Sequence, residues 1–189
     1  MSKLLLLENR LFFTPVYSTD VDVDTDQLVA LALEQNYIDR EKCTGKQTVN
    51  FLLYDHIQMI PMFKDIQVYV NEISERLGID KKLKIKNYWF NIHKKGDYGN
   101  SHFHREGILS GVMYLKSPSD CGKIVFERTD LQEHYFEADN ITEYSYKNYS
   151  YEPKKGRLLL FPSYLKHRIE SNNTTEDDDT RISLSFNYA

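Results

Sequence analysis

The spacing of apolar residues changes near residue 83, and this change restricts the possible folds more than any other feature of the chain. Beyond it, apolar residues recur in short runs, and turn-forming residues separate the runs. The expected strands cover residues 84–93, 108–115, 123–127, 157–161, 167–170 and 180–187. Several short strands in succession are typical of a β-sandwich or barrel. We therefore expect a mainly β core.

Two helices are expected before this point, and we interpret them as a brace packed against a sheet. The first begins after Asp24, a good N-cap residue, and continues to about Gln35. The second begins at Pro61 and ends at Gly78. Its buried face is predicted by the three- and four-residue spacing of Phe63, Ile66, Val70, Ile73 and Leu77.

The remaining N-terminal segments predict one strand and one loop. Residues 11–17 are apolar and aromatic, and Pro15 would place this strand at a sheet edge. Residues 36–49 are polar and predict a loop. We expect a single domain of 189 residues, in which residues 1–80 contain the strand and the bracing helices and residues 81–189 form the β core.

The composition excludes several classes of protein. The two cysteines, Cys43 and Cys121, fit neither a disulfide framework nor a cysteine-rich metal site, so a cytoplasmic location is expected. The apolar run at residues 4–7 is too short for a signal peptide, and no apolar run is long enough to span a membrane. The net charge of −4 comes from interspersed charges, so we do not expect nucleic acid as a partner.

Three histidines carry the most specific chemical signal. His102 and His104 lie two residues apart, and on an extended chain both side chains would point the same way. Both imidazoles could then reach one cation at a distance of about 2 Å. A third ligand must come from a distant part of the chain, and His167 is the candidate. Arg181 follows on the next expected strand.

Several segments resemble the 2-oxoglutarate/Fe(II)-dependent oxygenase superfamily, and their order resembles its prolyl-hydroxylase-like subgroup. The resemblance is carried by residues 111–115 (GVMYL), 122–126 (GKIVF), 156–163 (GRLLLFPS), His167 and residues 181–183 (RIS). It extends to small bacterial and phage members with the motifs His-x-His, Ser-Gly-Val-x-Tyr-Leu, Phe-Pro-Ser-x-x-x-His and Arg-x-Ser-x-Ser-Phe-Asn. It covers the C-terminal half well and the N-terminal half loosely.

This resemblance implies a double-stranded β-helix, the jelly-roll core also found in cupins, with a metal near its open mouth. It also implies a bacterial or phage-encoded enzyme that uses Fe(II), 2-oxoglutarate and O₂ to hydroxylate a small molecule or a peptide. Loops at residues 94–100 and 129–151 would surround the mouth and select the substrate. Two alternatives remain: a jelly roll that binds a metal or a small acid without turnover, and a cupin-like metal enzyme that does not use 2-oxoglutarate.

The metal ligands have two alternative registers. The family motif is His-x-Asp or His-x-Glu with a distal histidine, and this sequence departs from it. In one register His102, His104 and His167 form a three-histidine site; in the other, Glu106 supplies the carboxylate beside His104 and His167. We favour the first, which matches the His-x-His pattern. In this first register, Glu106 would orient one of the ligand histidines. In the second register, His102 would not bind the metal but would orient water or substrate.

The resemblance also assigns residues to the distal carboxylate of 2-oxoglutarate. Arg181 would bind it through two parallel hydrogen bonds, which lysine cannot reproduce. Ser183 faces the same side of the expected strand, and Tyr114 would offer its hydroxyl. Tyr88 and Asn91 are further candidate contacts on the preceding strand. The other histidines are expected to be ordinary polar residues, with His93 exposed at a strand end and no ligand pattern beside His56 or His134.

Overall fold

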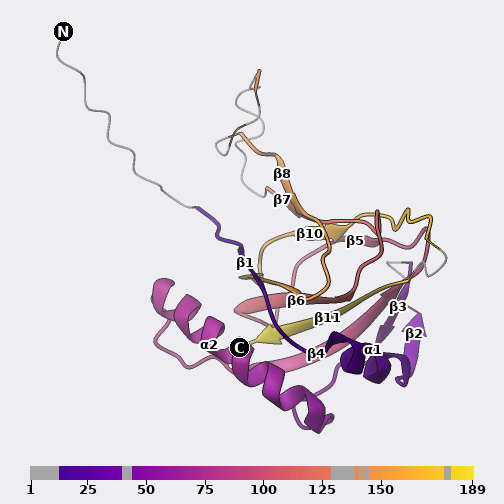
Figure 1. Ribbon diagram of the computed structural model, residues 1–189. Coiled ribbons are helices and arrows are strands. Elements are labelled where there is room, and N and C mark those ends of the chain that lie inside the picture. Colours follow the sequence, from indigo (N-terminus) through magenta and orange to yellow (C-terminus); the bar gives the residue numbers. More distant parts are fainter. Residues whose placement is uncertain (1–12, 40–43, 129–138, 141, 143–144, 177–179) are drawn as a thin grey trace.

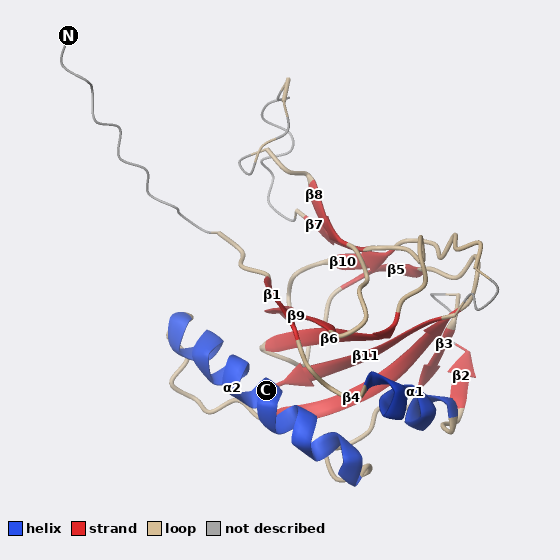
Figure 2. Cartoon of the chain, in the orientation of Figure 1, coloured by secondary structure: helices blue, strands red, loops and turns tan. Residues whose placement is uncertain are grey.

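The computed structural model describes residues 13–39, 44–128, 139–140, 142, 145–176 and 180–189. Within these residues there are two α-helices, one short 3₁₀-helix (Ile57–Met59) and two antiparallel sheets. The helices are α1 (Thr25–Leu33) and α2 (Ile60–Arg76). Figures 1 and 2 show three layers, with the helices on one side of the larger sheet and the smaller sheet on its other side.

The larger sheet has seven strands in the order β1-β9-β6-β11-β4-β3-β2. Its strands are β1 (Tyr17–Asp20), β2 (Tyr37–Asp39), β3 (Lys46–Thr48), β4 (Ile85–His93), β6 (Leu109–Lys116), β9 (Arg157–Pro162) and β11 (Arg181–Tyr188). The smaller sheet has the order β5-β10-β7-β8. Its strands are β5 (Gly99–His102), β7 (Ile124–Glu127), β8 (Asn148–Tyr151) and β10 (His167–Ile169).

The larger sheet has one apolar face and one face that is more polar. On β4, Tyr88 and Phe90 are buried in the core that the helices cover, whereas Trp89, Asn91 and His93 line a cavity on the opposite face. The two-residue period of a strand sends alternate side chains to opposite faces, so one strand serves both layers. The polar face is where a site can form between the sheets.

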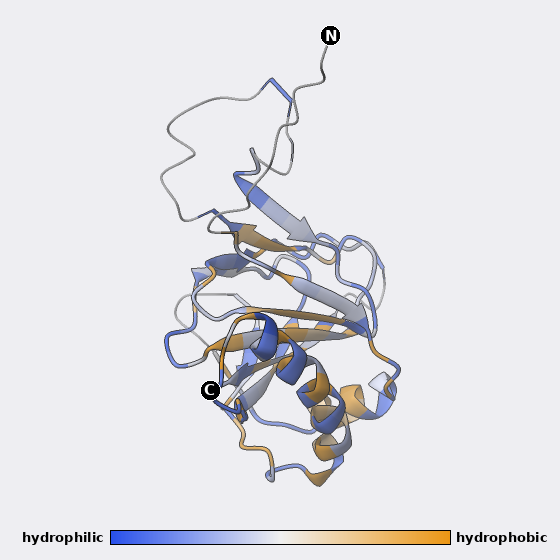
Figure 3. Cartoon of the chain, turned by 90° about the vertical axis from the view of Figure 1, so that its left-hand side faces the viewer, coloured by the Kyte–Doolittle hydropathy of each residue, from blue (hydrophilic) through white to orange (hydrophobic). Residues whose placement is uncertain are grey.

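Helix α2 covers the apolar face as its spacing predicts, except that Leu77 is 38% exposed and follows the end of the helix. Its buried residues include Phe63, Ile66 and Val70, and the Phe63 ring lies 5.3 Å from that of Tyr88 on β4. Figure 3 shows apolar and polar stretches alternating along the helices below the sheet. Helix α1 begins where expected, because the Asp24 side chain accepts a hydrogen bond of 3.0 Å from the backbone N–H of Gln27.

Four short strands differ from the expectation, and one of them, β5, begins inside the segment 94–100 that was expected to be a loop. Residues 36–49 were expected to form a loop, but they contain β2 and β3, which extend the larger sheet beyond β4. β8 lies inside the segment 129–151 that was expected to be a loop, and it pairs with β7. These strands have three or four residues each, too few to produce a clear apolar period. β1 begins at Tyr17, at the edge of its sheet, where the predicted strand 11–17 ends; residues 11 and 12 lie outside the described residues.

The segments before residue 80 share a sheet with those after it. β1, β2 and β3 join the larger sheet together with β4, β6, β9 and β11. In the described part of the chain no helix has the length and apolar character needed to cross a membrane.

Candidate metal centre

The register of the smaller sheet brings two of the predicted histidines together. His102 is the last residue of β5 and His167 is the first residue of β10, and they lie directly opposite each other in the antiparallel ladder. Directly opposed residues on antiparallel strands have their side chains on the same face. The two ring centroids are 4.4 Å apart. Residues 65 positions apart are thus neighbours because of strand pairing alone.

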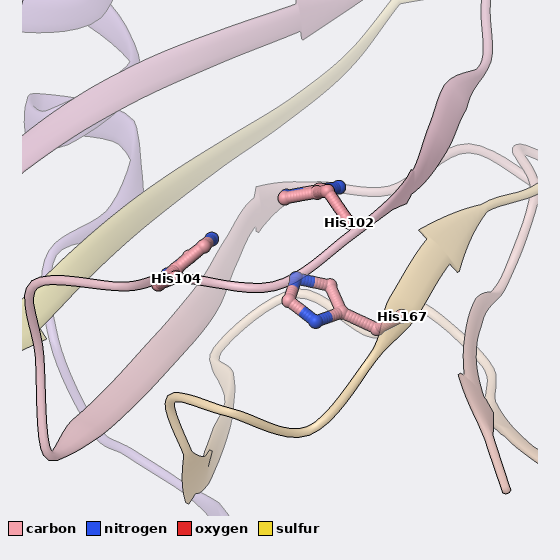
Figure 4. Close-up of side chains that lie close together, drawn as sticks. All are labelled: His102, His104 and His167. Atoms are coloured by element: carbon pink, nitrogen blue, oxygen red, sulfur yellow. The ribbon is translucent and has the colours of Figure 1, made fainter. Parts of the chain in front are cut away.

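His104 completes the cluster from the segment that follows β5. Its backbone N–H donates a hydrogen bond of 2.8 Å to the carbonyl oxygen of Ser163, which fixes this segment against the end of β9. Its ring centroid lies 5.2 Å from that of His167 and 5.3 Å from that of His102. The three side chains offer ligand atoms within 4.8 Å of one another, and they converge on one region in Figure 4.

The hydrogen bonds of His102 and His167 fix which nitrogen of each ring faces the cluster. Nδ1 of His102 lies 2.8 Å from the carbonyl oxygen of Asn100, and Nδ1 of His167 lies 2.8 Å from that of Leu165. A carbonyl oxygen only accepts, so each Nδ1 carries the proton and donates it. The lone pair of each neutral ring is therefore on Nε2. In this tautomer Nε2 can bind a metal.

His104 is held in the same tautomer by side chains rather than by the backbone. Its Nδ1 lies 2.8 Å from Oδ1 of Asn187 and 2.8 Å from Oγ of Ser110. The Asn187 side-chain NH₂ group donates a hydrogen bond of 2.9 Å to Oδ1 of Asn87. This bond orients the Asn187 amide so that Oδ1 of Asn187 faces His104. The Ser110 hydroxyl donates a hydrogen bond of 2.7 Å to Oδ1 of Asn187. It also lies 2.8 Å from the hydroxyl of Ser163. No sequence pattern singled out Asn187, Ser110 or Ser163 as ligand-orienting residues, although Asn187 ends the Arg-x-Ser-x-Ser-Phe-Asn motif.

Burial keeps the deepest member of the cluster neutral. His167 is 4% exposed. Loss of hydration, followed by the neighbouring His102, lowers its pKa to about 3. Imidazole nitrogens are common ligands of divalent transition metals, and their bonds to such metals are about 2.0–2.1 Å long. Ligands on one such ion lie about 3–4 Å apart, which small inward movements of these rings would achieve.

Glu106 lies outside this cluster. Its side chain is exposed, and Oε2 lies 3.0 Å from Nζ of Lys86. The oxygens that orient the histidine rings belong to Asn100, Leu165 and Asn187 instead. The expectation that Glu106 orients a ligand histidine is therefore wrong: its carboxylate is directed to a surface lysine. Among the described residues, the group that could hold an ion is His102, His104 and His167.

A cavity of about 470 Å³ connects the histidines to Arg181. Arg181 is 2% exposed, and its Nη1 donates to the carbonyl oxygens of Cys121 (2.7 Å) and Gly122 (2.8 Å). Its Nε has no hydrogen-bond partner among the described residues, and neither has the hydroxyl of Tyr114. Buried polar atoms without partners are rare because each costs about 1–3 kcal/mol. Two of them in one cavity fit the recognition of an anionic group.

The charges of these two residues suit such a group. Burial lowers the pKa of Arg181, but a guanidinium stays protonated at neutral pH. Burial raises the pKa of Tyr114, so its hydroxyl keeps its proton and can donate. Ser183 also lines the cavity and lies opposite Tyr114 in the β6–β11 ladder.

The other expected contacts divide between the two faces of β4. Asn91 lines the cavity and donates 3.0 Å to Oγ of Ser185. Tyr88 does not reach the cavity: it is fully buried on the apolar face, where its hydroxyl lies 2.6 Å from Nδ1 of His56. The expectation of an exposed His93 is also wrong, because His93 is 8% exposed and lines the cavity. His134 lies outside the described residues.

Comparisons with known proteins agree on one class. A family model described as "Putative 2OG-Fe(II) oxygenase" matches residues 87–187, and no curated protein matches the chain. A viral collagen prolyl hydroxylase from Paramecium Bursaria Chlorella virus-1, solved with 2-oxoglutarate, is similar with 16% identity, 92% of this chain and 94% of that chain covered, and a TM-score of 0.62. A Pseudomonas putida prolyl-4-hydroxylase is similar with 16% identity, 92% and 91% coverage, and a TM-score of 0.62.

A third similar structure is HygX from Streptomyces hygroscopicus, solved with nickel and 2-oxoglutarate, with 11% identity, 93% and 83% coverage, and a TM-score of 0.60. At these identities the likenesses concern the fold. They confirm the expected mainly β class with bracing helices and a jelly-roll, double-stranded β-helix core.

Proposed function

The chain belongs to the 2OG-Fe(II) oxygenase family, and we propose that His102, His104 and His167 hold its iron while Arg181, Tyr114 and Ser183 bind its 2-oxoglutarate. The observation that carries this proposal is the common tautomer of the three histidines. Each Nδ1 is within 2.8 Å of an oxygen acceptor, so the free lone pair of each ring is on Nε2. The three rings converge on one region (Figure 4). That region shares a cavity with a buried guanidinium.

When bound, iron and 2-oxoglutarate would supply the oxidation. One O₂ and one 2-oxoglutarate would be consumed, with one oxygen atom incorporated into succinate as CO₂ is released and the other into a hydroxyl group on the substrate. The protein contributes positions and electrostatics. The three neutral imidazoles leave the charge of a divalent cation uncompensated, which favours a dianionic cosubstrate. The guanidinium of Arg181 binds the distal carboxylate of 2-oxoglutarate. The carbonyl oxygens of Cys121 and Gly122 hold this guanidinium in place.

The polar wall of the cavity is the proposed substrate side. Asn87, Trp89 and Asn91 on β4 and Ser185 on β11 line it beside the histidines. The Trp89 ring lies 5.6 Å from that of His104. We propose a small molecule or a peptide as the substrate. Similar folds include a collagen prolyl hydroxylase and an enzyme solved with hygromycin B.

Succinate formation tests the proposal directly. Purified protein is incubated with Fe(II), ascorbate, O₂ and 2-oxoglutarate, and succinate is quantified with and without candidate substrates. We expect slow substrate-independent succinate formation that is lost in His102→Ala, His104→Ala and His167→Ala. His56→Ala is the matched control, because His56 lies on the other side of β4 against Tyr88. Equal succinate formation by the histidine variants and the wild type would contradict the assignment of the ligands.

A second candidate is a jelly roll that binds a metal and a small acid without turnover. One observation favours it: the described ligand group contains no carboxylate, unlike the usual two-histidine, one-carboxylate site. In that case metal and 2-oxoglutarate would bind, but no succinate would form with any substrate.

The cupin-like alternative would not use 2-oxoglutarate. Arg181→Ala separates it from the first proposal: affinity for 2-oxoglutarate should fall strongly if Arg181 binds the cosubstrate, whereas the wild type would show no such affinity in a cupin-like enzyme. Arg181→Lys keeps the charge without the planar pair of donors, and we expect it to recover little of the loss.

A further inference from the structure

His93 is a buried histidine that the proposed function leaves unused. It is the last residue of β4, it is 8% exposed, and it lines the cavity. Its Nδ1 has no hydrogen-bond partner among the described residues. Native proteins rarely leave a buried ring nitrogen unsatisfied unless a ligand or water completes it.

Unsatisfied atoms gather at this part of the cavity. The described residues contain four buried side-chain polar atoms without a partner, and three of them belong to His93, Tyr114 and Arg181. His93 lies directly opposite Arg181 in the β4–β11 ladder, so both side chains project from the same face of the sheet. Tyr114 approaches from β6, on the other side of β11. Three neighbouring strands therefore direct incompletely bonded groups into one cavity.

The His93 ring cannot easily turn to another partner. It packs against Gly45, where an added Cβ would lie 2.8 Å from Cδ2 of His93. Its backbone carbonyl accepts a hydrogen bond of 3.0 Å from the side chain of Asn172. The hairpin of β2 and β3 thus covers one side of the ring, and the cavity remains on the other.

The charge state of the ring suits an anion beside Arg181. Loss of hydration, followed by the positive charge of Arg181, lowers the pKa of His93 to about 3, so the free protein carries a neutral imidazole with one N–H donor. A carboxylate has about four acceptor positions, and Arg181 and Tyr114 use only part of them. One of the remaining positions can accept the imidazole N–H.

Resting on the proposed function, we propose that His93 is a further contact to the distal carboxylate of 2-oxoglutarate and makes the site selective for 2-oxo acids with two carboxylates. A histidine that served only to fill the core would affect every 2-oxo acid equally. A histidine that contacts the distal carboxylate would affect only acids that possess it. This difference defines the experiment.

The test compares two ligands on nickel-loaded full-length protein by isothermal titration calorimetry. 2-Oxoglutarate has the distal carboxylate, and 2-oxopentanoate has the same carbon chain without it. We expect His93→Phe to weaken 2-oxoglutarate binding about 10-fold or more, the usual loss for one hydrogen bond to a charged group. Binding of 2-oxopentanoate should change by less than about twofold. His93→Asn, which restores an N–H donor near the position of Nδ1, should recover part of the selectivity.

His56→Phe is the control for the substitution itself, because it changes another histidine beside β4 on the face away from the cavity. Equal weakening of both acids by His93→Phe, or no weakening of either, would overturn the inference. If His93→Phe does not fold, His93→Ala, which leaves space instead of adding bulk, is measured by the same ratio. Wild-type protein that binds neither acid would refute the proposed function instead, so the two failures are distinguishable.

Discussion

At the scale of single residues, the site depends on groups that orient the imidazoles as much as on the imidazoles themselves. His102 and His167 use backbone carbonyls, whereas His104 uses the side chain of Asn187. A backbone acceptor cannot be removed by substitution, but a side-chain acceptor can. Asn187 is therefore the position at which ligand orientation can be tested.

We expect Asn187→Ala to weaken metal binding about 10- to 100-fold, the usual effect of losing a residue that orients a ligand histidine. Without the amide oxygen, Nδ1 of His104 loses the acceptor that holds its proton. The dissociation constant for Co²⁺ is measured by competition with a chromophoric chelator. The control is Asn173→Ala, an exposed asparagine beyond β10. Unchanged affinity in Asn187→Ala would show that Ser110 alone orients the ring.

The neutral state of His93 predicts a pH dependence of stability. An unfolded histidine has a pKa near 6.5, whereas burial and then the charge of Arg181 lower that of folded His93 to about 3. Between pH 6.5 and about 3, His93 binds a proton in the unfolded chain but not in the folded protein. The contribution of neutral His93 to the free energy of unfolding is therefore fully present above pH 6.5 and is lost as the pH decreases toward 3. The slope from this residue is about 1.4 kcal/mol per pH unit.

Urea unfolding between pH 4 and 7 measures this slope in chelator-treated protein. His93→Asn removes the titrating group. As the pH decreases, the free energy of unfolding of this variant should therefore fall with a slope that is smaller than the wild-type slope by about 1.4 kcal/mol per pH unit. Burial also lowers the pKa of His167, and this contribution is common to both proteins. Parallel profiles would contradict a buried neutral His93.

The predicted ligand histidines are brought together by the fold, but their surroundings could not be predicted. The spacing of His102 and His104 is local, and His167 precedes a recognisable strand. The acceptor for His104 lies 83 residues away, and a sequence does not show which amide will face a ring. The burial of His93 was missed because its cover, the hairpin near Gly45, was expected to be a loop.

At the scale of elements, the turn between β6 and β7 has two roles. It connects the larger sheet to the smaller one, and the carbonyl oxygens of Cys121 and Gly122 hold Arg181. Gly122 has φ +83°, and a Cβ there would overlap the carbonyl oxygen of Glu170 and lie 2.7 Å from that of Ser171. Glycine is required here by both conformation and space.

We expect Gly122→Ala to destabilise the protein by more than about 2 kcal/mol, because the backbone beside β10 must move in addition to the cost of a positive φ. The matched control is Gly96→Ala, which has φ +86° but nothing within 4 Å of the added Cβ. Its cost should be about 1 kcal/mol, the conformational penalty alone. Urea unfolding of both variants measures the difference, and equal losses would contradict the steric argument.

Long elements were predictable, but short ones only in part: β7 and β10 coincide with predicted strands, whereas β2, β3, β5 and β8 do not. Helix α2 and strands β4, β6, β9 and β11 carry enough apolar residues to reveal their period. β2, β3 and β8 have few apolar residues, and they form where neighbouring strands offer backbone partners. Tertiary context decides such segments.

At the scale of the whole molecule, the proposed ion would connect the two sheets. His102 and His167 belong to the smaller sheet, whereas His104 is bonded through Ser110 and Asn187 to β6 and β11 of the larger sheet. Metal binding should therefore stabilise the fold as a unit. A ligand at 100 times its dissociation constant adds about 2.7 kcal/mol to the free energy of unfolding.

We expect Ni²⁺ to raise the melting temperature of the wild type and EDTA to reverse the increase. His102→Ala should abolish the increase with little effect on the metal-free protein, because His102 is exposed in the cluster. Differential scanning fluorimetry measures both quantities, with His56→Ala as the control. A metal-dependent increase that persists in His102→Ala would place the stabilising ion elsewhere.

The pairing of His102 with His167 also limits how this protein can change by insertion and deletion. Successive residues of a strand face opposite sides, so a one-residue slip of β5 against β10 would turn one imidazole away from its partner. Descendants of this chain can therefore accept few insertions or deletions in β5 and β10, or in the segment after β5, which holds His104 against Ser163. A single residue gained or lost inside β5 or β10 would remove the metal centre while leaving a foldable jelly roll.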